Sequence, residues 1–310
     1  MLNILFSASP LAWAEYQEPL NAAFAKAGLD AHLSCDHAPA DVDYIIFAPN
    51  GPVTDFRPYT RTKAVMGLWA GVETIVNNET LTQPLCRLVD ESLTSGMVEW
   101  VTGHTLRHHL GMDTHIFGQD GVWRDDRFPP VAANRPVTIL GFGALGVACG
   151  QALHGLGFPV TGWSRNPKDI PNIACLHGDE GLRTALSGAE IVILLLPQTA
   201  ETTNILNAET LALMARGSFV INPGRGPLID DAALLDALRS GQIAHATLDV
   251  FRTEPLPQDD PYWAHPQITV TPHIASTTRP ETAAEVIAEN IQRGEAGRPF
   301  NFLVDRARGY

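Results

Sequence analysis

Three ionisable side chains lie where α/β proteins place their chemistry. Arg225, Glu254 and His273 each stand at the end of a segment that predicts a β-strand, or in the loop just after one. Ligands of α/β sheets bind at the carboxyl ends of the strands. Taken singly, a loop arginine is more often a surface charge, and a histidine beside a proline is more often structural. A functional role for these three residues therefore depends on the motifs around them.

A glycine pattern supplies the first of these motifs. Gly141-Phe-Gly143-Ala-Leu-Gly146 stands between a predicted strand at 136–140 and a predicted helix at 147–156. Gly141 permits a tight turn, Gly143 lets a pyrophosphate approach the backbone N–H groups at the helix start, and Gly146 lets the helix pack on the strand. An ordinary glycine-rich turn is the alternative, but the strand–turn–helix context favours dinucleotide binding.

The next predicted strand, at 158–163, indicates which dinucleotide is bound. Such folds usually carry an Asp or Glu at the end of this strand to bind the ribose 2′-hydroxyl. Here Ser164 and Arg165 stand in its place. A carboxylate would repel a 2′-phosphate, whereas a guanidinium fork can bind one. We therefore predict NADP(H) in preference to NAD(H), the alternative being that Arg165 is a solvated surface residue.

The elements that must position these residues alternate between strand and helix through nearly the whole chain, which predicts an α/β fold with parallel sheets. A helical pattern at 92–109 and a closing helix at 281–295 bracket the second α/β series. We therefore expect two Rossmann- or flavodoxin-like domains. A dinucleotide-binding domain at 97–278 would be inserted into a discontinuous substrate-binding domain at 1–96 and 279–310. Ligands usually bind in the cleft between such domains, and its closure would exclude water.

The remaining predicted elements have weaker boundaries. Strands are expected at 3–6, 44–47, 64–69, 191–196, 218–222, 244–250 and 267–270, and a first helix at 11–27 that ends at Gly28.

Composition bounds the function classes. With 310 residues, the chain is long enough for about two domains. Its formal charge of −13 and its lack of a basic stripe argue against nucleic-acid binding. The longest apolar run, Ile191 to Leu196, is too short to cross a membrane. Four scattered cysteines and an amino-terminal segment that reads as a strand are typical of a cytoplasmic protein with reduced thiols.

At this point the sequence resembles the D-isomer-specific 2-hydroxyacid dehydrogenases over nearly its whole length. The ordered blocks that carry the resemblance are Trp69-Ala-Gly-Val-Glu73, the Gly141 loop, Leu196-Pro197 with Glu201-Thr202, and the segments around Arg225, Glu254 and His273. Within the family it is most similar to the glyoxylate/hydroxypyruvate reductases of the bacterial A type, judged by Trp163-Ser164-Arg165 and the closing Val304 to Tyr310. The family loop often has Gly and Asp where this chain has Trp69 and Glu73, which affects substrate size more than reaction type.

The resemblance implies that Arg225, Glu254 and His273 are catalytic. Arg225 would bind the substrate carboxylate or polarise the keto oxygen. His273 would give its proton to that oxygen as hydride reaches C2, and Glu254 would orient the imidazole and favour its charged form. In the oxidation direction His273 would be the general base. The expected reaction is reduction of glyoxylate or hydroxypyruvate by NADPH, giving glycolate or D-glycerate.

The resemblance also implies the ligand contacts and a homodimer. Asp249 would hold the nicotinamide carboxamide. Cofactor contacts are expected at Gly141, Gly143, Ala144, Leu145, Gly146, Trp163, Ser164, Arg165, Leu196, Pro197, Thr202, Pro223, Gly224 and Asp249. The small oxo or hydroxy acid would contact Trp69, Ala70, Gly71, Val72, Arg225 and His273, with backbone N–H groups of the glycine turn on its carboxylate. Trp69 could equally be a buried strand residue.

Three alternatives stay open. His104 and His108 are four residues apart on a predicted helix, but no third ligand completes a metal motif, so we expect no metal and place these histidines on a helix surface or interface. The same fold could act on another 2-oxo acid with NADH. A non-catalytic cofactor sensor would keep the glycine loop and lose activity, although the presence of all three ionisable residues argues against it.

Overall fold

The computed structural model describes residues 1–125 and 128–306, in two compact units. Unit 1 comprises residues 1–93 and 277–310, and unit 2 comprises residues 94–276. The sequence placed these boundaries after residues 96 and 278. Residues 307–310, which contributed to the family resemblance, lie outside the described residues. No helix among the described residues is long and apolar enough to cross a membrane.

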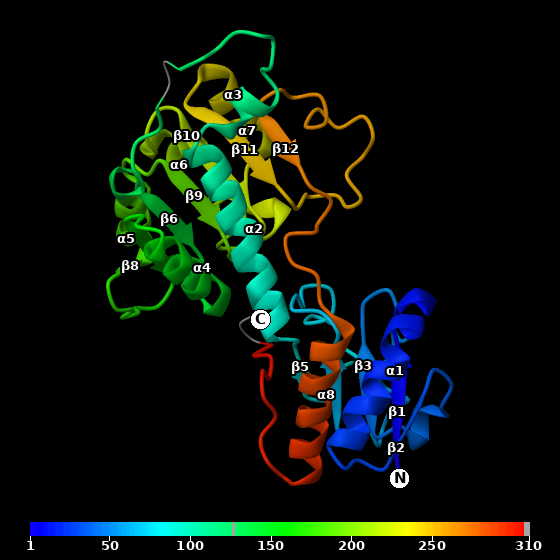
Figure 1. The fold of residues 1–310 in the computed structure, drawn as a ribbon. Coiled ribbons are helices and arrows are strands. Elements are labelled where there is room, and N and C mark those ends of the chain that lie inside the picture. Colours follow the sequence, from blue (N-terminus) through cyan, green and yellow to red (C-terminus); the bar gives the residue numbers. More distant parts are fainter. Residues whose placement is uncertain (126–127, 307–310) are drawn as a thin grey trace. The chain divides into compact units, whose positions relative to one another are not determined.

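Unit 1 contains a parallel five-stranded sheet in the order β2-β1-β3-β4-β5 (Figure 1). Its strands are β1 (Leu2–Ser7), β2 (Ala31–Ser34), β3 (Tyr44–Phe47), β4 (Ala64–Gly67) and β5 (Leu85–Cys86). Helices α1 (Pro10–Lys26) and α8 (Pro280–Glu295) belong to the same unit although they are far apart in sequence. The strand order is that of the flavodoxin-like doubly wound fold.

Alternating strand residues divide the core of unit 1 into two layers. Ile4 and Met66 face one side of the sheet, where they pack with buried residues of α1 and α8. Leu5 and Val65 face the other side, where they pack with the segments that follow β3 and β4. Strands buried on both faces read as continuous apolar runs, which is why β1, β3 and β4 were predictable. Helix α1 is followed by Gly28 in a left-handed conformation (φ 69°), as the sequence predicts for a helix end.

Unit 2 contains a parallel seven-stranded sheet in the order β12-β11-β10-β9-β6-β7-β8. Its strands are β6 (Val137–Leu140), β7 (Val160–Ser164), β8 (Ala174–His177), β9 (Ile191–Leu194), β10 (Ser218–Asn222), β11 (Ile243–Leu248) and β12 (Ile268–Val270). Its helices are α2 (Glu91–His109, which begins in unit 1), α3 (Met112–Ile116), α4 (Ala144–Gly155), α5 (Gly178–Leu186), α6 (Ala208–Leu213) and α7 (Asp231–Ser240). Strands β7 and β8 extend the sheet on one side of β6, and β9 to β12 extend it on the other. The point between β6 and β9, where the strand order changes side, is where a Rossmann fold binds its dinucleotide.

Helices cover both faces of this second sheet (Figure 1). Ile139 and Ile193 pack with residues of α2 and α4 on one face. Leu140 and Leu194 pack with residues of α5, α6 and α7 on the other. The predicted fold class, two parallel α/β domains of Rossmann and flavodoxin type, is therefore confirmed.

The structure corrects the sequence analysis at the sheet edges and on helix α2. Strands β2, β5 and β8 were not predicted, because each is a short edge strand. Strands β2 and β8 have polar and half-exposed residues rather than an apolar run, and β5 has only two residues. The histidines of α2 were expected on a helix surface or at an interface, but His108 and His109 are buried within unit 2, with 4% and 6% of their surface exposed. The ring of His108 stacks on Phe219 of β10, and its Nε2 lies 2.9 Å from the Thr247 hydroxyl.

Candidate active site

The glycine loop leaves β6 and opens helix α4 at the switch point of the unit 2 sheet. Gly141 has φ 101°, and a Cβ on it would lie 2.4 Å from the carbonyl carbon of Leu195. A Cβ on Gly146 would lie 2.1 Å from the Gly141 carbonyl oxygen, whereas a Cβ on Gly143 would meet nothing within 4 Å. Two glycines therefore permit close packing, and the third leaves open space beside the helix N-terminus.

That helix end suits an anion. Gly143 is the N-cap residue of α4, and no side chain caps it by a hydrogen bond. Backbone N–H groups at the first turn and the positive end of the helix dipole attract phosphate. The Trp163 carbonyl accepts hydrogen bonds from the N–H groups of Gly141 and Phe142, both at 3.0 Å, which fixes the loop to the end of β7. The residues present thus fit a dinucleotide pyrophosphate.

The three predicted catalytic residues follow three neighbouring strands of the same sheet. Arg225 follows β10, Glu254 follows β11 and His273 follows β12, and these strands are parallel and adjacent. All three side chains therefore start from the carboxyl ends of the strands, and the glycine loop follows the carboxyl end of β6 in the same sheet. We call this side of the sheet the sheet edge. Adjacent strands are about 4.8 Å apart, so this part of the edge is on the order of 10 Å wide.

Glu254 and His273 form a direct pair. His273 Nδ1 lies 2.7 Å from Glu254 Oε2, and the Phe251 N–H donates to Glu254 Oε1 at 2.8 Å. The carboxylate is therefore fixed at both oxygens, and it accepts from the imidazole at Nδ1. About half of the His273 side chain is exposed, and Nε2 is the ring nitrogen left for a substrate oxygen. This arrangement suits a general acid that is oriented by a carboxylate.

Arg225 is half-buried in a turn held by a residue that sequence reasoning missed. Asn222, the last residue of β10, is 1% exposed. Its side-chain oxygen accepts from the Gly224 N–H at 3.1 Å, and its amide nitrogen donates to the Arg225 carbonyl at 2.9 Å. Asparagine favours such local bonds to the backbone of a turn, so its place just before Pro223-Gly224 is the signal that could have identified it.

The other predicted cofactor residues differ in how far they reach solvent. Trp163 is buried, and its indole N–H donates to the Gly178 carbonyl at 2.9 Å. Arg165 is exposed beyond the end of β7. A hydrogen bond from Thr199, with a smaller contribution from the positive charge of Arg165, holds the pKa of Glu201 below the ordinary value for a glutamate. Thr202 Oγ1 donates to the Pro197 carbonyl at 2.8 Å and orders the turn after β9. Leu196, which precedes this turn, is buried.

The predicted substrate loop follows β4 in unit 1. Val72 is buried in the unit 1 core, whereas 45% of Trp69 is exposed. The alternative interpretation of Trp69 as a buried strand residue is therefore wrong. Across residues 1–125 and 128–306, the N–H groups of Ala70 and Gly71 donate no hydrogen bond to another backbone group. These two N–H groups could bind a carboxylate.

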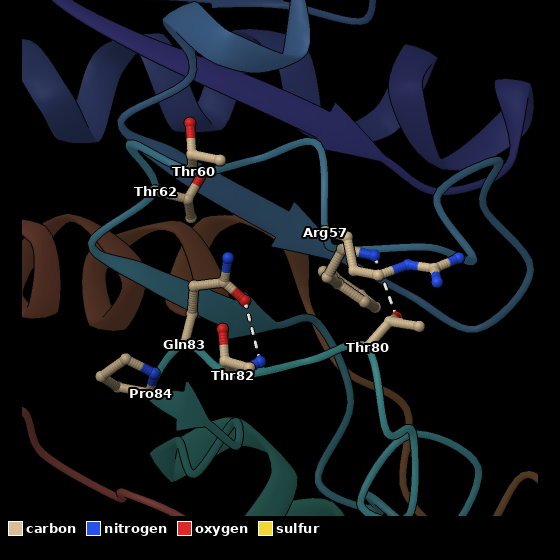
Figure 2. Close-up of a pocket in the computed structure, with 8 residues that line it drawn as sticks. Arg57, Thr60, Thr62, Thr80, Thr82, Gln83 and Pro84 are labelled. Atoms are coloured by element: carbon tan, nitrogen blue, oxygen red, sulfur yellow. Dashed lines mark hydrogen bonds between the residues drawn. The ribbon is translucent and has the colours of Figure 1, made fainter.

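Unit 1 also has a pocket of about 530 Å³, and no residue of the Trp69–Val72 loop lines it (Figure 2). Two of its lining residues come just before strands: Thr62 precedes β4, and Pro84 precedes β5. The pocket therefore lies at the amino ends of these strands. Two of its polar side chains already form hydrogen bonds: Thr62 donates to the Val42 carbonyl, and Gln83 donates to the Tyr59 carbonyl. None of the predicted site residues lines it.

Helix α2 brings neutral imidazoles against the unit 2 sheet. Burial, followed by the positive charges of His245 and Arg107, lowers the pKa of His108 to about 2. Burial likewise lowers the pKa of His245 to about 4, and its Nε2 lies 2.8 Å from the Thr269 hydroxyl. His108 of α2 and His245 of β11 pack together and bind threonine hydroxyls of the sheet. Their role is therefore to stabilise the fold of unit 2.

Comparison with known proteins agrees with this geometry. The family profile described as D-isomer specific 2-hydroxyacid dehydrogenase, NAD binding domain, matches residues 102–275. The chain is 38% identical to the glyoxylate/hydroxypyruvate reductase A of Serratia proteamaculans (strain 568), over all of both chains.

Solved structures are similar over the same length. A D-isomer specific 2-hydroxyacid dehydrogenase from Xanthobacter autotrophicus Py2, in complex with NADPH and MES, is 40% identical, covers 99% of each chain and has a TM-score of 0.93. An NADPH-dependent glyoxylate/hydroxypyruvate reductase from Sinorhizobium meliloti, in complex with NADP and sulfate, is 30% identical over 100% of each chain, with a TM-score of 0.87. The family profile and the full-length relatives show that this chain belongs to the D-isomer specific 2-hydroxyacid dehydrogenases.

Proposed function

We propose that this protein reduces small 2-oxo acids with NADPH, converting glyoxylate to glycolate and hydroxypyruvate to D-glycerate. The observation that carries the proposal is the pairing of His273 with Glu254 on the sheet edge that also holds the glycine loop. The relatives named glyoxylate/hydroxypyruvate reductase support the substrate class.

In this proposal each residue has a distinct task. The nicotinamide, when bound, supplies the hydride that reaches C2 of the oxo acid. His273 donates the proton that the keto oxygen gains, and Glu254 orients the ring through Nδ1. Arg225 binds the carboxylate or polarises the keto oxygen. In the reverse direction His273 accepts the hydroxyl proton as a general base.

Ligand recognition in this proposal has two parts. The N–H groups at the start of α4 hold the pyrophosphate, and Ser164 with Arg165 binds the 2′-phosphate of NADP(H). The Trp69–Val72 segment of unit 1 holds the substrate carboxylate through its backbone, with Trp69 limiting substrate size. Asp249, Pro197 and Thr202 complete the nicotinamide end. The complexes of relatives with NADPH and NADP support this choice of cofactor.

The test is steady-state kinetics on a panel of 2-oxo acids, each with NADPH and NADH. We expect the highest kcat/KM with glyoxylate or hydroxypyruvate and NADPH. His273→Ala should lower kcat by about 10²–10⁴-fold, because it removes the general acid. His154→Ala, at an exposed position on α4, is the matched control and should retain wild-type kcat. Preference for NADH and another oxo acid would replace this substrate assignment. Cofactor binding without turnover of any oxo acid would favour the sensor.

We further propose that the protein acts in the cytoplasm as a homodimer. Half of the exposed large hydrophobic side chains of the described residues lie between residues 110 and 131. These are Leu110, Met112, Ile116, Phe117, Val122, Trp123, Phe128 and Val131. Such a concentration is typical of an association surface, and a second copy of this chain is the partner we assign to it. In light scattering, Trp123→Glu should halve the mass of the wild-type particle, whereas Trp263→Glu should not. A monomeric wild type would contradict the proposal.

A further inference from the structure

The carboxylate of Asp249 is buried at the end of β11, and it is occupied by the loop that carries His273. Asp249 is 0% exposed. Its Oδ1 accepts from the Thr271 hydroxyl at 2.5 Å and from the Ile274 N–H at 2.9 Å. Its Oδ2 accepts from the Ala275 N–H at 2.8 Å. A carboxylate offers about four acceptor positions. Three of them are therefore occupied by donors from residues on both sides of His273.

The backbone of His273 needs such support. Its φ of 55° lies in the left-handed region, which is unfavourable for residues other than glycine. Its N–H donates to the Asp249 carbonyl at 2.8 Å. Asp249 thus holds His273 through its main chain and holds the flanking residues through its side chain. Ala275, which packs in the unit 2 core at 3% exposure, anchors the far end of the loop.

We infer that Asp249, acting through Thr271, is a positioning residue that sets the direction of the His273 imidazole. The inference rests on the proposed function of His273 as the general acid. It gives Asp249 a task separate from the carboxamide contact expected from the family. The Asp249 carboxylate binds residues on both sides of His273 and so stabilises the left-handed backbone at that residue. Glu254, from the neighbouring loop, binds Nδ1 of the imidazole. A proton donor that is displaced from its acceptor loses rate without losing cofactor binding.

Two substitutions of Thr271 form a matched pair. Thr271→Val keeps the shape and removes the hydroxyl donor, whereas Thr271→Ser keeps the donor. We expect Thr271→Val to lower kcat for the oxo acid by about tenfold, with the KM for NADPH close to wild type, and to lower the Tm modestly because the buried carboxylate loses a donor. Thr271→Ser should stay within about twofold of the wild-type kcat. A wild-type kcat in Thr271→Val, or equal losses in both variants, would overturn the inference.

A double-mutant cycle with His273 separates positioning from general destabilisation. In the His273→Ala background the imidazole is absent, so adding Thr271→Val should change the residual rate by less than about twofold. The same tenfold loss in both backgrounds would overturn the inference, because Thr271 would then act independently of His273. A loss confined to the KM for NADPH would assign Asp249 to the cofactor instead. Failure of the proposed function looks different, because the wild-type enzyme would then turn over no 2-oxo acid.

Discussion

Acidification should destabilise unit 2 through the buried histidines of the α2–sheet interface. His108 is 4% exposed, and burial lowers its pKa to about 2 from an ordinary value of about 6.5. Below pH 6.5 the unfolded chain therefore binds a proton at this position that the folded protein excludes. The free energy of unfolding is highest above pH 6.5, and it falls as the pH drops from 6.5 towards 2.

The size of the loss follows from this linkage. Each pH unit within the window removes about 1.4 kcal/mol for one such histidine. Between pH 7 and pH 5, allowing for the rounded onset near pH 6.5, His108 should remove about 2 kcal/mol from the free energy of unfolding. His245 adds to the loss down to its own pKa of about 4. A loss of this order is a substantial part of the stability of an ordinary domain.

Urea unfolding of the full chain at pH 7 and pH 5 measures the effect. His108→Gln keeps a neutral polar group near Thr247 but cannot titrate, so its loss between the two pH values should be about 2 kcal/mol smaller than that of the wild type. His154→Gln, at an exposed position, controls for removal of a histidine and should keep the wild-type pH dependence. Identical pH dependence in His108→Gln and wild type would refute the reasoning.

Four other substitutions test the site. Arg165→Asp should reverse the preference for NADPH over NADH in kcat/KM, because the carboxylate repels a 2′-phosphate; an unchanged preference would exclude Arg165 from cofactor selection. Gly143→Ala should raise the KM for NADPH with little change in Tm, since its Cβ meets only open space, whereas Gly146→Ala should lower the Tm, since its Cβ would lie 2.1 Å from a carbonyl oxygen; equal Tm values would contradict this. Asn222→Ala should lower kcat/KM for the oxo acid by about tenfold, because it leaves the turn before Arg225 without two hydrogen bonds; wild-type kinetics would show that the turn holds itself.

The predictable parts of the fold were those buried on both faces. Apolar runs such as Ile191–Leu194 give a strong signal, and the glycine pattern fixed the strand–turn–helix unit around Gly143. Edge strands such as Ala31–Ser34 were missed, because their pairing partner, rather than their composition, makes them strands. The burial of His108 was missed for a related reason: tertiary contacts with Phe219 and Thr247 outweigh the polarity of the ring.

The order of the motifs predicted the candidate catalytic residues, but it did not predict the residues that support them. Glu254 and His273 are separated by 19 residues, and parallel pairing of β11 with β12 brings them within 2.7 Å. Sequence spacing cannot give such a distance. Asn222 was not recognised at all, because a single asparagine at a predicted strand end is unremarkable until its two hydrogen bonds to the Arg225 turn are known.

In the candidate site, the residues that support the loops differ from those to which we assign the chemistry. Asn222 and Asp249 are buried, with 1% and 0% of their surface exposed, and each ends or directly follows a strand. Each turns its polar atoms to the loop that carries Arg225 or His273, and the Asp249 N–H donates to the Asn222 carbonyl at 3.0 Å. Because Asn222 and Asp249 lie at the carboxyl ends of paired strands, they can support the loops that present Arg225 and His273 to a ligand. Substitution of Arg225 or His273 should therefore change substrate binding or turnover and leave the Tm close to wild type, whereas substitution of Asn222 or Asp249 should change the kinetics and also lower the Tm.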